Sequence, residues 1–189
     1  MKPDRLIAGL PGGVVLRTAS PGDAGALCAA YVANREHLAP WEPRRPDDFF
    51  TVEGQAHRLG ERLREYEGGR LVPWLLEADD GRVVGTITLS GIVLGPFCSA
   101  YLGYWTDADH QGRGLATAAV REVCGIAARE MGLHRVEAGT LTDNVRSQRV
   151  LERCGFELIG TAPRYLHIDG AWRDHRLFQR ILHEGPPRP

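Results

Sequence analysis

The chain has 189 residues, of which 43% are hydrophobic and 25% are charged, and its formal net charge is −1 at pH 7. This length suits one domain with a sizeable core, and the near-neutral charge argues against a general nucleic-acid or membrane surface. Because no apolar run reaches the ~18 residues of a membrane span, we expect neither nucleic acid nor membrane among the partners.

The N-terminal stretch and the cysteines indicate the compartment. Residues 1–15 lack a continuous apolar core followed by a cleavage site, so we expect no signal peptide. Four cysteines lie far apart and form no C-x-x-C pair, which makes zinc and redox sites poor interpretations; they are Cys28, Cys98, Cys124 and Cys154. Free thiols suit a reducing cytoplasm, so we predict a cytoplasmic protein.

The first third of the chain predicts a strand followed by helices. Residues 14–17 are typical of a strand, and residues 20–23 (SPGD) combine a capping residue, a first-turn proline and an acid, which predicts the start of a helix. Apolar residues at helical spacing predict an amphipathic helix over 51–66. Between the helices, residues 34–43 contain two prolines, so we predict an irregular, semi-rigid segment.

Trp41 and Glu42 stand between those two prolines. One interpretation is that Trp41 fills the core and Glu42 is solvated. The other is that the segment lines a substrate pocket.

The middle of the chain predicts a meander of strands. Residues 72–78 and 83–90 flank the turn signal DDGR and predict a hairpin, and residues 97–106 predict the next strand. A polar break and the stretch QGRGLAT at 111–117 follow.

The stretch 111–117 predicts a strand–turn–helix unit with an anion site. Glycine permits positive φ and close approach to the backbone, and the first turn of a helix presents free N–H groups at the positive end of its dipole. The helix is predicted from apolar residues at helical spacing, namely Leu115, Ala119, Val123, Ile126 and Ala127. Neither G-x-G-x-x-G nor G-x-x-x-x-G-K-[ST] is present. An ordinary strand–helix turn is the alternative interpretation.

The last third predicts a strand, a short helix and more strands. Residues 134–141 indicate a strand, and residues 145–154 a short helix that Gly155 ends in the C′ position. Residues 156–160 indicate another strand. A final hairpin is predicted from residues 165–168 and 171–182 around Asp169-Gly170, a dipeptide that type I′ turns prefer. Residues 185–189 are expected to be a frayed tail.

Two segments resemble signatures of the GCN5-related N-acetyltransferases (GNAT). Gln111-x-x-Gly114-x-Ala116 resembles their pyrophosphate loop, and residues 144–156 resemble their N-x-x-S…(V/A)-L-x-x-x-G-F segment. The order of predicted elements is similar to the GNAT fold over nearly the whole chain. The resemblance implies an α/β (α+β) fold with a mixed, mostly antiparallel central sheet flanked by helices and splayed at the cofactor-binding strand. It also implies a single N-acetyltransferase domain over residues 1–189, with a core of about 14–183.

Three further segments resemble the ribosomal-protein alanine N-acetyltransferases of the RimJ/RimL branch, and RimJ most of all: residues 34–43, 101–104 and 168–175. The resemblance implies that a primary amine, the N-terminal α-amine of a ribosomal protein, attacks acetyl-CoA directly, with no metal. Relatives act on other amines, so a small-molecule or antibiotic acetyltransferase is the alternative, and a non-catalytic acyl-CoA-binding module is a third. Monomer and homodimer both stay open.

The resemblance also implies a set of cofactor contacts. The strand at 104–106 would pair with the pantetheine arm as an added strand does, and one of its N–H groups would meet the thioester oxygen. The predicted cofactor-binding residues are Tyr104, Trp105, Thr106, Gln111, Gly112, Arg113, Gly114, Leu115, Ala116, Thr117, Asn144 and Ser147. Three have plainer alternatives: Arg113 as a solvated charge, Asn144 as the N-cap of the short helix, and Ser147 as a first-turn serine bonded to backbone.

Catalysis requires a neutral amine, and an α-amine with a pKa near ~8 needs only modest help from a base. The glutamates that family members use as a base correspond here to Gly139 and Ile159, so neither is available. We predict Glu42 as the base and Ser147 as the proton donor to the leaving thiolate, with Glu137 and Asp174 as alternative bases. Predicted substrate contacts are Trp41, Glu42 and Tyr165. The run at 172–175 is interpreted either as substrate recognition or as a strand with alternating faces.

Overall fold

The computed structural model describes residues 8–187. Part of the N-terminal stretch considered for a signal peptide, and the last two residues of the predicted tail, therefore lie outside the described residues.

One eight-stranded sheet organises the described chain, in the order β1-β2-β3-β4-β5-β6-β8-β7. Its strands are β1 (Ala8–Gly9), β2 (Val15–Thr18), β3 (Leu71–Glu77), β4 (Val83–Val93), β5 (Ser99–Thr106), β6 (Arg135–Leu141), β7 (Glu157–Ile168) and β8 (Ala171–Ile181). Neighbouring strands are antiparallel except β5 and β6, which are parallel. The predicted mixed, mostly antiparallel sheet is confirmed.

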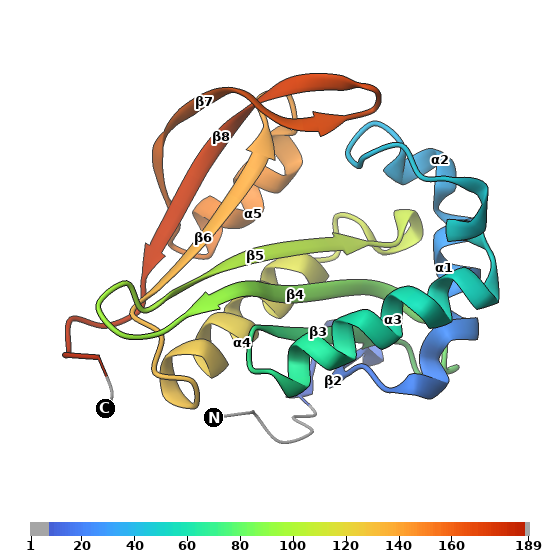
Figure 1. The fold of residues 1–189 in the computed structure, drawn as a ribbon, viewed down its shortest axis with the longest axis horizontal. Coiled ribbons are helices and arrows are strands. Elements are labelled where there is room, and N and C mark those ends of the chain that lie inside the picture. The colour runs from blue at the N-terminus through green and yellow to red at the C-terminus, as the bar shows by residue number, and fades with distance from the viewer. Residues whose placement is uncertain (1–7, 188–189) are drawn as a thin grey trace.

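Helices cover both faces of this sheet. The α-helices are α1 (Ala24–Ala33), α2 (Arg35–Leu38), α3 (Val52–Glu67), α4 (Leu115–Arg129) and α5 (Val145–Arg153), and the short 3₁₀ helices are η1 (Pro11–Gly13), η2 (Pro21–Asp23), η3 (Asp47–Phe50) and η4 (Ala108–His110). Figure 1 shows α3 in front of β3 and β4, and α4 behind the same strands. Within residues 8–187, no helix combines the length and the apolar character that crossing a membrane requires.

Two buried clusters fill the space between helices and sheet. The larger one joins the apolar stripe of α4 to one face of β2–β6 and includes Trp74, Ile87 and Val123. The smaller one joins α1 and α3 to the other face and includes Tyr31 and Trp105. Period-2 alternation along the strands sends side chains to opposite faces, which explains why both faces could bury a core. All four cysteines are buried and free, as predicted.

The sheet opens between β5 and β6. These strands pair only from Ser99 to Tyr101 and from Arg135 to Glu137. Beyond that point they diverge, and Figure 1 shows the gap between β5 and the β6–β7–β8 unit. The predicted splay is confirmed, and it leaves one edge of β5 unpaired from Leu102 onward.

Two local predictions need correction. The segment 34–43 is not wholly irregular, because it contains the single turn α2, which ends before Pro40 as helices do when a proline follows. Residues 156–160 and 165–168 are not separate strands. They belong to the continuous β7, which stays paired with β8 through two register irregularities, the second beside Arg164 with its φ of 49°.

Candidate active site

A cleft of about 980 Å³ occupies the opening between β5 and β6. Its wall includes thirteen of the predicted site residues: Trp41, Glu42, Tyr104, Trp105, Thr106, Gln111, Gly112, Gly114, Leu115, Ala116, Thr117, Asn144 and Ser147. Two predicted residues do not line it. Arg113 is exposed to solvent, and Tyr165 lies on β7 with its ring 5.6 Å from that of His175.

The glycine turn leaves the N-terminus of α4 open toward the cleft. Gly112 and Gly114 have φ angles of 71° and 79°, which glycine adopts without strain. Gly114 is the N-cap of α4, so no side chain caps the first-turn N–H groups. No heavy atom lies within 4 Å of where a Cβ would stand at either glycine. Free N–H groups, the helix dipole and open space together suit a phosphate.

Gln111 links two segments across the mouth of the cleft. Its Nε2 lies 2.9 Å from His37 Nε2 on α2, and Arg146 Nη1 on α5 donates to its Oε1 at 2.6 Å. His37 Nε2 also lies 3.3 Å from the carbonyl of Thr106, but a neutral ring that accepts from Gln111 cannot donate there with the same nitrogen. Sequence reasoning missed His37 and Arg146, because no local pattern brings them to Gln111.

Asn34 holds the residues just before the glycine turn in place. It is 1% exposed, donates through Nδ2 to Asp107 Oδ2 at 2.8 Å, and accepts from the Ala108 N–H at 3.0 Å. Burial alone would raise the pKa of Asp107, but hydrogen bonds from Asn34 and from the Asp109 N–H outweigh it and lower that pKa. An ionised Asp107 therefore fixes the start of the turn to α1.

Ser147 contacts a half-buried tyrosine in the cleft. Its Oγ lies 2.9 Å from the hydroxyl of Tyr104, and that hydroxyl also donates to the Ser147 carbonyl at 3.3 Å. Burial raises the pKa of Tyr104, against a smaller lowering by the Ser147 hydrogen bond, so the phenol stays protonated at neutral pH. The pair forms a hydroxyl chain that can deliver a hydrogen bond or a proton to a group in the cleft.

Asn144 is the N-cap of α5, because its Oδ1 accepts from the Ser147 N–H at 3.1 Å. The capping alternative for this residue is thus what the structure has, while its side chain also lines the cleft. The oxygen serves the helix, and the amide nitrogen is the atom that remains for a ligand.

Trp41 and Glu42 line the opposite wall. Trp41 is 37% exposed, so the interpretation that it fills the core is wrong. Glu42 Oε2 accepts from Arg45 Nη2 at 3.0 Å and from Arg45 Nε at 3.2 Å. The Glu42 carbonyl accepts from the Asp169 N–H at 3.1 Å, which ties this segment to the tip of the β7–β8 hairpin.

Tyr101 occupies the space that a side chain at position 139 would need. A Cβ on Gly139 would stand 2.3 Å from the Tyr101 hydroxyl. Both residues line the cleft, and burial, with smaller contributions from Tyr165 and Glu137, raises the pKa of Tyr101 to about 12. A neutral phenol therefore fills the space beside position 139, where a base was sought from the resemblance.

The alternative bases have other partners. Glu137 Oε1 lies 3.2 Å from Arg135 Nε, and Asp174 Oδ1 accepts from the Arg164 N–H at 2.8 Å. In the 172–175 run Trp172, Arg173 and Asp174 are all exposed, whereas the buried His175 lines the cleft.

Comparison with known proteins agrees with this geometry. The family model described as "Acetyltransferase (GNAT) domain" matches residues 14–157. The chain is 40% identical over 150 residues to "Probable N-acetyltransferase YjcK" of Bacillus subtilis, covering 76% of this chain and 80% of the relative. It is 36% identical over 166 residues to the "[Ribosomal protein uS5]-alanine N-acetyltransferase" of Escherichia coli, covering 87% and 85%.

A solved structure of Mycobacterium smegmatis RimJ in complex with CoA-disulfide superposes with a TM-score of 0.87 at 34% identity, covering 93% of this chain and 86% of that one. The likeness to RimJ predicted from the sequence is confirmed. The chain therefore belongs to the GNAT family of N-acetyltransferases.

Proposed function

We propose that this protein transfers the acetyl group of acetyl-CoA to the N-terminal α-amine of a ribosomal protein, acting as a single domain. Support comes from the relative named as a uS5-alanine N-acetyltransferase and from the neighbour solved with CoA-disulfide. The observation that carries the proposal is the adjacency of the uncapped α4 N-terminus and the unpaired edge of β5 in one cleft.

The residues present fit acetyl-CoA. The N–H groups at the start of α4 would hold its pyrophosphate, since anions bind at helix N-termini. The free edge of β5 from Leu102 to Thr106 offers backbone groups to the amides of the pantetheine arm. When bound, acetyl-CoA supplies an acyl group on a good leaving thiol.

Side chains of this chain would accept and donate the protons of the reaction. Glu42 lines the cleft and keeps Oε1 clear of its contacts with Arg45, so it would accept a proton from the amine, directly or through water. Ser147, backed by the protonated Tyr104, would donate a hydrogen bond or proton to the departing sulfur. The two groups come from opposite walls, which suits an acid and a base that act on different atoms.

Mass spectrometry of acetylated products tests the proposal. The acceptors are a peptide with an N-terminal alanine and one internal lysine, the same peptide with a formylated N-terminus, and a small primary amine. We expect one acetyl group on the α-amine of the first peptide and little on the other two acceptors. Faster acetylation of the small amine, or of the lysine in the blocked peptide, would replace the proposed acceptor class.

A further inference from the structure

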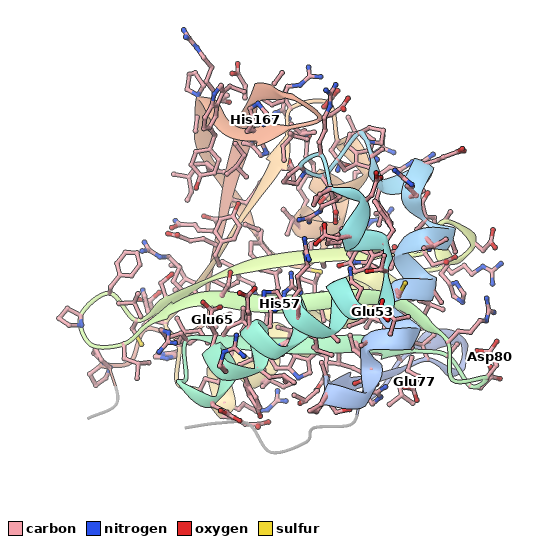
Figure 2. All side chains as sticks on the ribbon, turned by 45° about the vertical axis from the view of Figure 1, so that its right-hand side comes forward. Glu53, His57, Glu65, Glu77, Asp80 and His167 are labelled. Atoms are coloured by element: carbon pink, nitrogen blue, oxygen red, sulfur yellow. The ribbon has the colours of Figure 1, made fainter. Side chains whose placement is uncertain are left out.

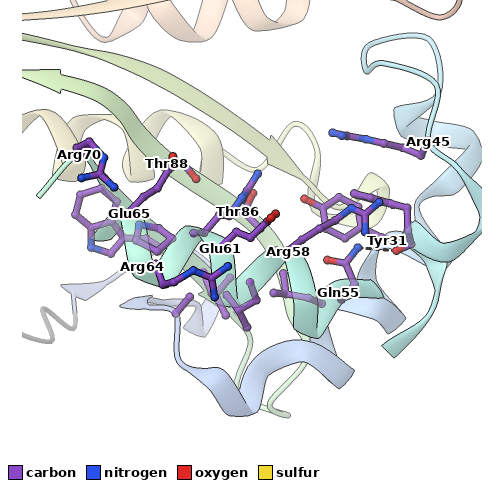
Figure 3. Close-up of a pocket in the computed structure, with 18 residues that line it drawn as sticks. Tyr31, Arg45, Gln55, Arg58, Glu61, Arg64, Glu65, Arg70, Thr86 and Thr88 are labelled. Carbon is purple, nitrogen blue, oxygen red and sulfur yellow. Dashed lines mark hydrogen bonds between the residues drawn. The ribbon is translucent and has the colours of Figure 1, made fainter. Parts of the chain in front are cut away.

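A second hollow lies between α3 and the sheet, on the face opposite α4. It has a volume of about 730 Å³ and is called the α3 groove here. A helix that packs on a sheet usually buries apolar side chains against it. Here the floor includes Thr86 and Thr88 of β4, and Figure 3 shows them beside Arg58, Glu61 and Glu65 of α3.

Arginine dominates the charge of the α3 groove. Five arginines and two glutamates line it: Arg45, Arg58, Arg62, Arg64, Arg70, Glu61 and Glu65. Arg45 and Arg58 pair with Glu42 and Asp48. Within residues 8–187, no ion pair joins a carboxylate to Arg62, Arg64 or Arg70. Guanidinium groups without a carboxylate suit carboxylates brought by a partner, which they bind bidentately.

The α3 groove adjoins the cleft. Arg45 lines the groove and its ion-pair partner Glu42 lines the cleft. Thr86 in the floor pairs in register with Trp105 of β5, whose indole N–H donates to the Tyr31 hydroxyl in the groove wall at 3.2 Å. A chain that leaves the cleft past Glu42 therefore meets the α3 groove next.

The direction from which the acceptor enters the cleft indicates what the α3 groove would bind. The α4 N-terminus, which would hold the pyrophosphate, belongs to the helix behind the sheet, whereas α3 lies in front (Figure 1). An amine that approaches the thioester from the side opposite the α4 N-terminus would enter from the α3 face, and the rest of its protein would lie there.

We propose that the α3 groove binds the acidic polypeptide that follows the acetylated residue of the acceptor protein. This inference rests on the proposed function. The helix is about 24 Å long, which an extended chain at ~3.3 Å per residue covers in roughly seven residues. The two glutamates in the wall argue against a nucleic-acid backbone, for which an uninterrupted basic stripe is typical.

Steady-state kinetics with three peptides test the groove. A tetrapeptide carries only the N-terminal residues, and two dodecapeptides extend it with eight residues containing either four glutamates or four serines. For the wild-type protein we expect a KM about tenfold lower for the acidic dodecapeptide than for the other two peptides. This difference in KM should shrink in 0.5 M salt.

The test variant Arg62→Ala with Arg70→Ala removes two of the three groove arginines that have no ion pair within the described residues. We expect it to lose the tenfold preference while kcat and the KM of the tetrapeptide stay within twofold. The matched control is Arg82→Ala with Arg121→Ala, which removes the same charge elsewhere. Arg82 pairs with Asp80, and Figure 2 shows Asp80 well apart from Glu65 of the groove. The control should keep the preference.

The outcomes separate this inference from the proposed function. Absence of acetylation on every peptide would overturn both. Acetylation of all three peptides with equal KM, or an acidic preference that survives the loss of Arg62 and Arg70, would overturn the groove alone. Competition by single-stranded RNA but not by the acidic peptide would assign the groove to nucleic acid instead.

Discussion

The two walls of the cleft present different chemistry. One wall, made by the edge of β5 and the start of α4, offers backbone N–H and C=O groups. The other, made by residues 37–42, β6 and the β7–β8 hairpin, offers side chains such as Trp41 and Glu42, and Tyr101 of β5 joins them where β5 still pairs with β6. Backbone groups suit the constant parts of a cosubstrate, whereas side chains suit an acceptor that differs among relatives.

The difference has a consequence for how each wall is built. The backbone wall needs glycine at two positions with positive φ, so a short local pattern encodes it. The side-chain wall depends on distant contacts, such as the bond from the Asp169 N–H to the Glu42 carbonyl. Damage to one wall should therefore change one substrate constant and spare the other.

Gly114→Val should have the largest effect. Gly114 has a φ of 79°, and a branched side chain there would meet the ligand and strain the turn. Loss of two charge-assisted hydrogen bonds of ~1.5 kcal/mol each corresponds to a KM for acetyl-CoA about 100-fold higher. The KM of the peptide should stay within twofold.

Gly81→Val is the matched control, because Gly81 has a φ of 81° and equally open surroundings in the β3–β4 turn. It should lower the melting temperature about as much as Gly114→Val and leave the KM for acetyl-CoA unchanged. An unchanged KM in folded Gly114→Val protein would remove the glycine turn from the cofactor site.

Ser147→Ala should lower kcat about 30-fold, below the usual ~10²–10⁴-fold of acid catalysis because a thiol with a pKa near ~8.5 leaves readily. The loss should persist at every pH below thiol ionisation. Tyr104→Phe keeps Ser147 and removes the two contacts of the phenol with it, at 2.9 Å to Oγ and 3.3 Å to the carbonyl, so its loss should be smaller. Wild-type kcat in Ser147→Ala would leave the serine without a catalytic role.

Glu42→Gln should lower kcat about tenfold at pH 7 with the KM for acetyl-CoA unchanged. The α-amine has a pKa near ~8, so the deficit should shrink as pH rises through that value and the free base no longer needs the carboxylate. The exposed Glu36 of α2 provides the control Glu36→Gln, which should match wild type. A pH–rate profile of Glu42→Gln that superposes on wild type would place the base elsewhere.

The contrast between the two walls also explains which features could be predicted from the sequence. Periodicity, caps and turn dipeptides predicted most of the strands and helices. Gln111-x-x-Gly114 located the backbone wall, and Asn144-x-x-Ser147 located the start of α5 in the same cleft, because each signal is local. The contacts of Gln111 with His37 and Arg146 join residues 74 and 35 positions apart, and no pattern of adjacent residues records them.

The acceptor wall illustrates the limit most clearly. Gly139 read alone looked like a missing glutamate, whereas in the fold it makes room for the hydroxyl of Tyr101 from the neighbouring strand. Likewise the two prolines suggested an irregular segment, but the turn α2 forms after Asn34, whose carbonyl accepts from the Leu38 N–H and whose side chain binds the distant Asp107.

A double-mutant cycle on Gly139 and Tyr101 should give the smallest effect and the sharpest view of the acceptor wall. Gly139→Ala places a Cβ 2.3 Å from the Tyr101 hydroxyl, the far end of a side chain that can shift, so we expect kcat/KM for the peptide to fall only about threefold. Tyr101→Phe removes the hydroxyl and should cost about as much. The double variant should lose no more than Tyr101→Phe alone, because the Cβ then meets only Leu177 Cδ2 at 3.5 Å and the ring carbon at 3.6 Å, which are ordinary van der Waals contacts. Since the pKa of Tyr101 is raised to about 12, the deficits of all three variants should stay constant from pH 6 to 9, unlike that of Glu42→Gln.

The KM for acetyl-CoA should not change in any of the three variants. Additive losses would show that the two residues act separately, and a rise in the KM for acetyl-CoA would mean that the two walls are not independent.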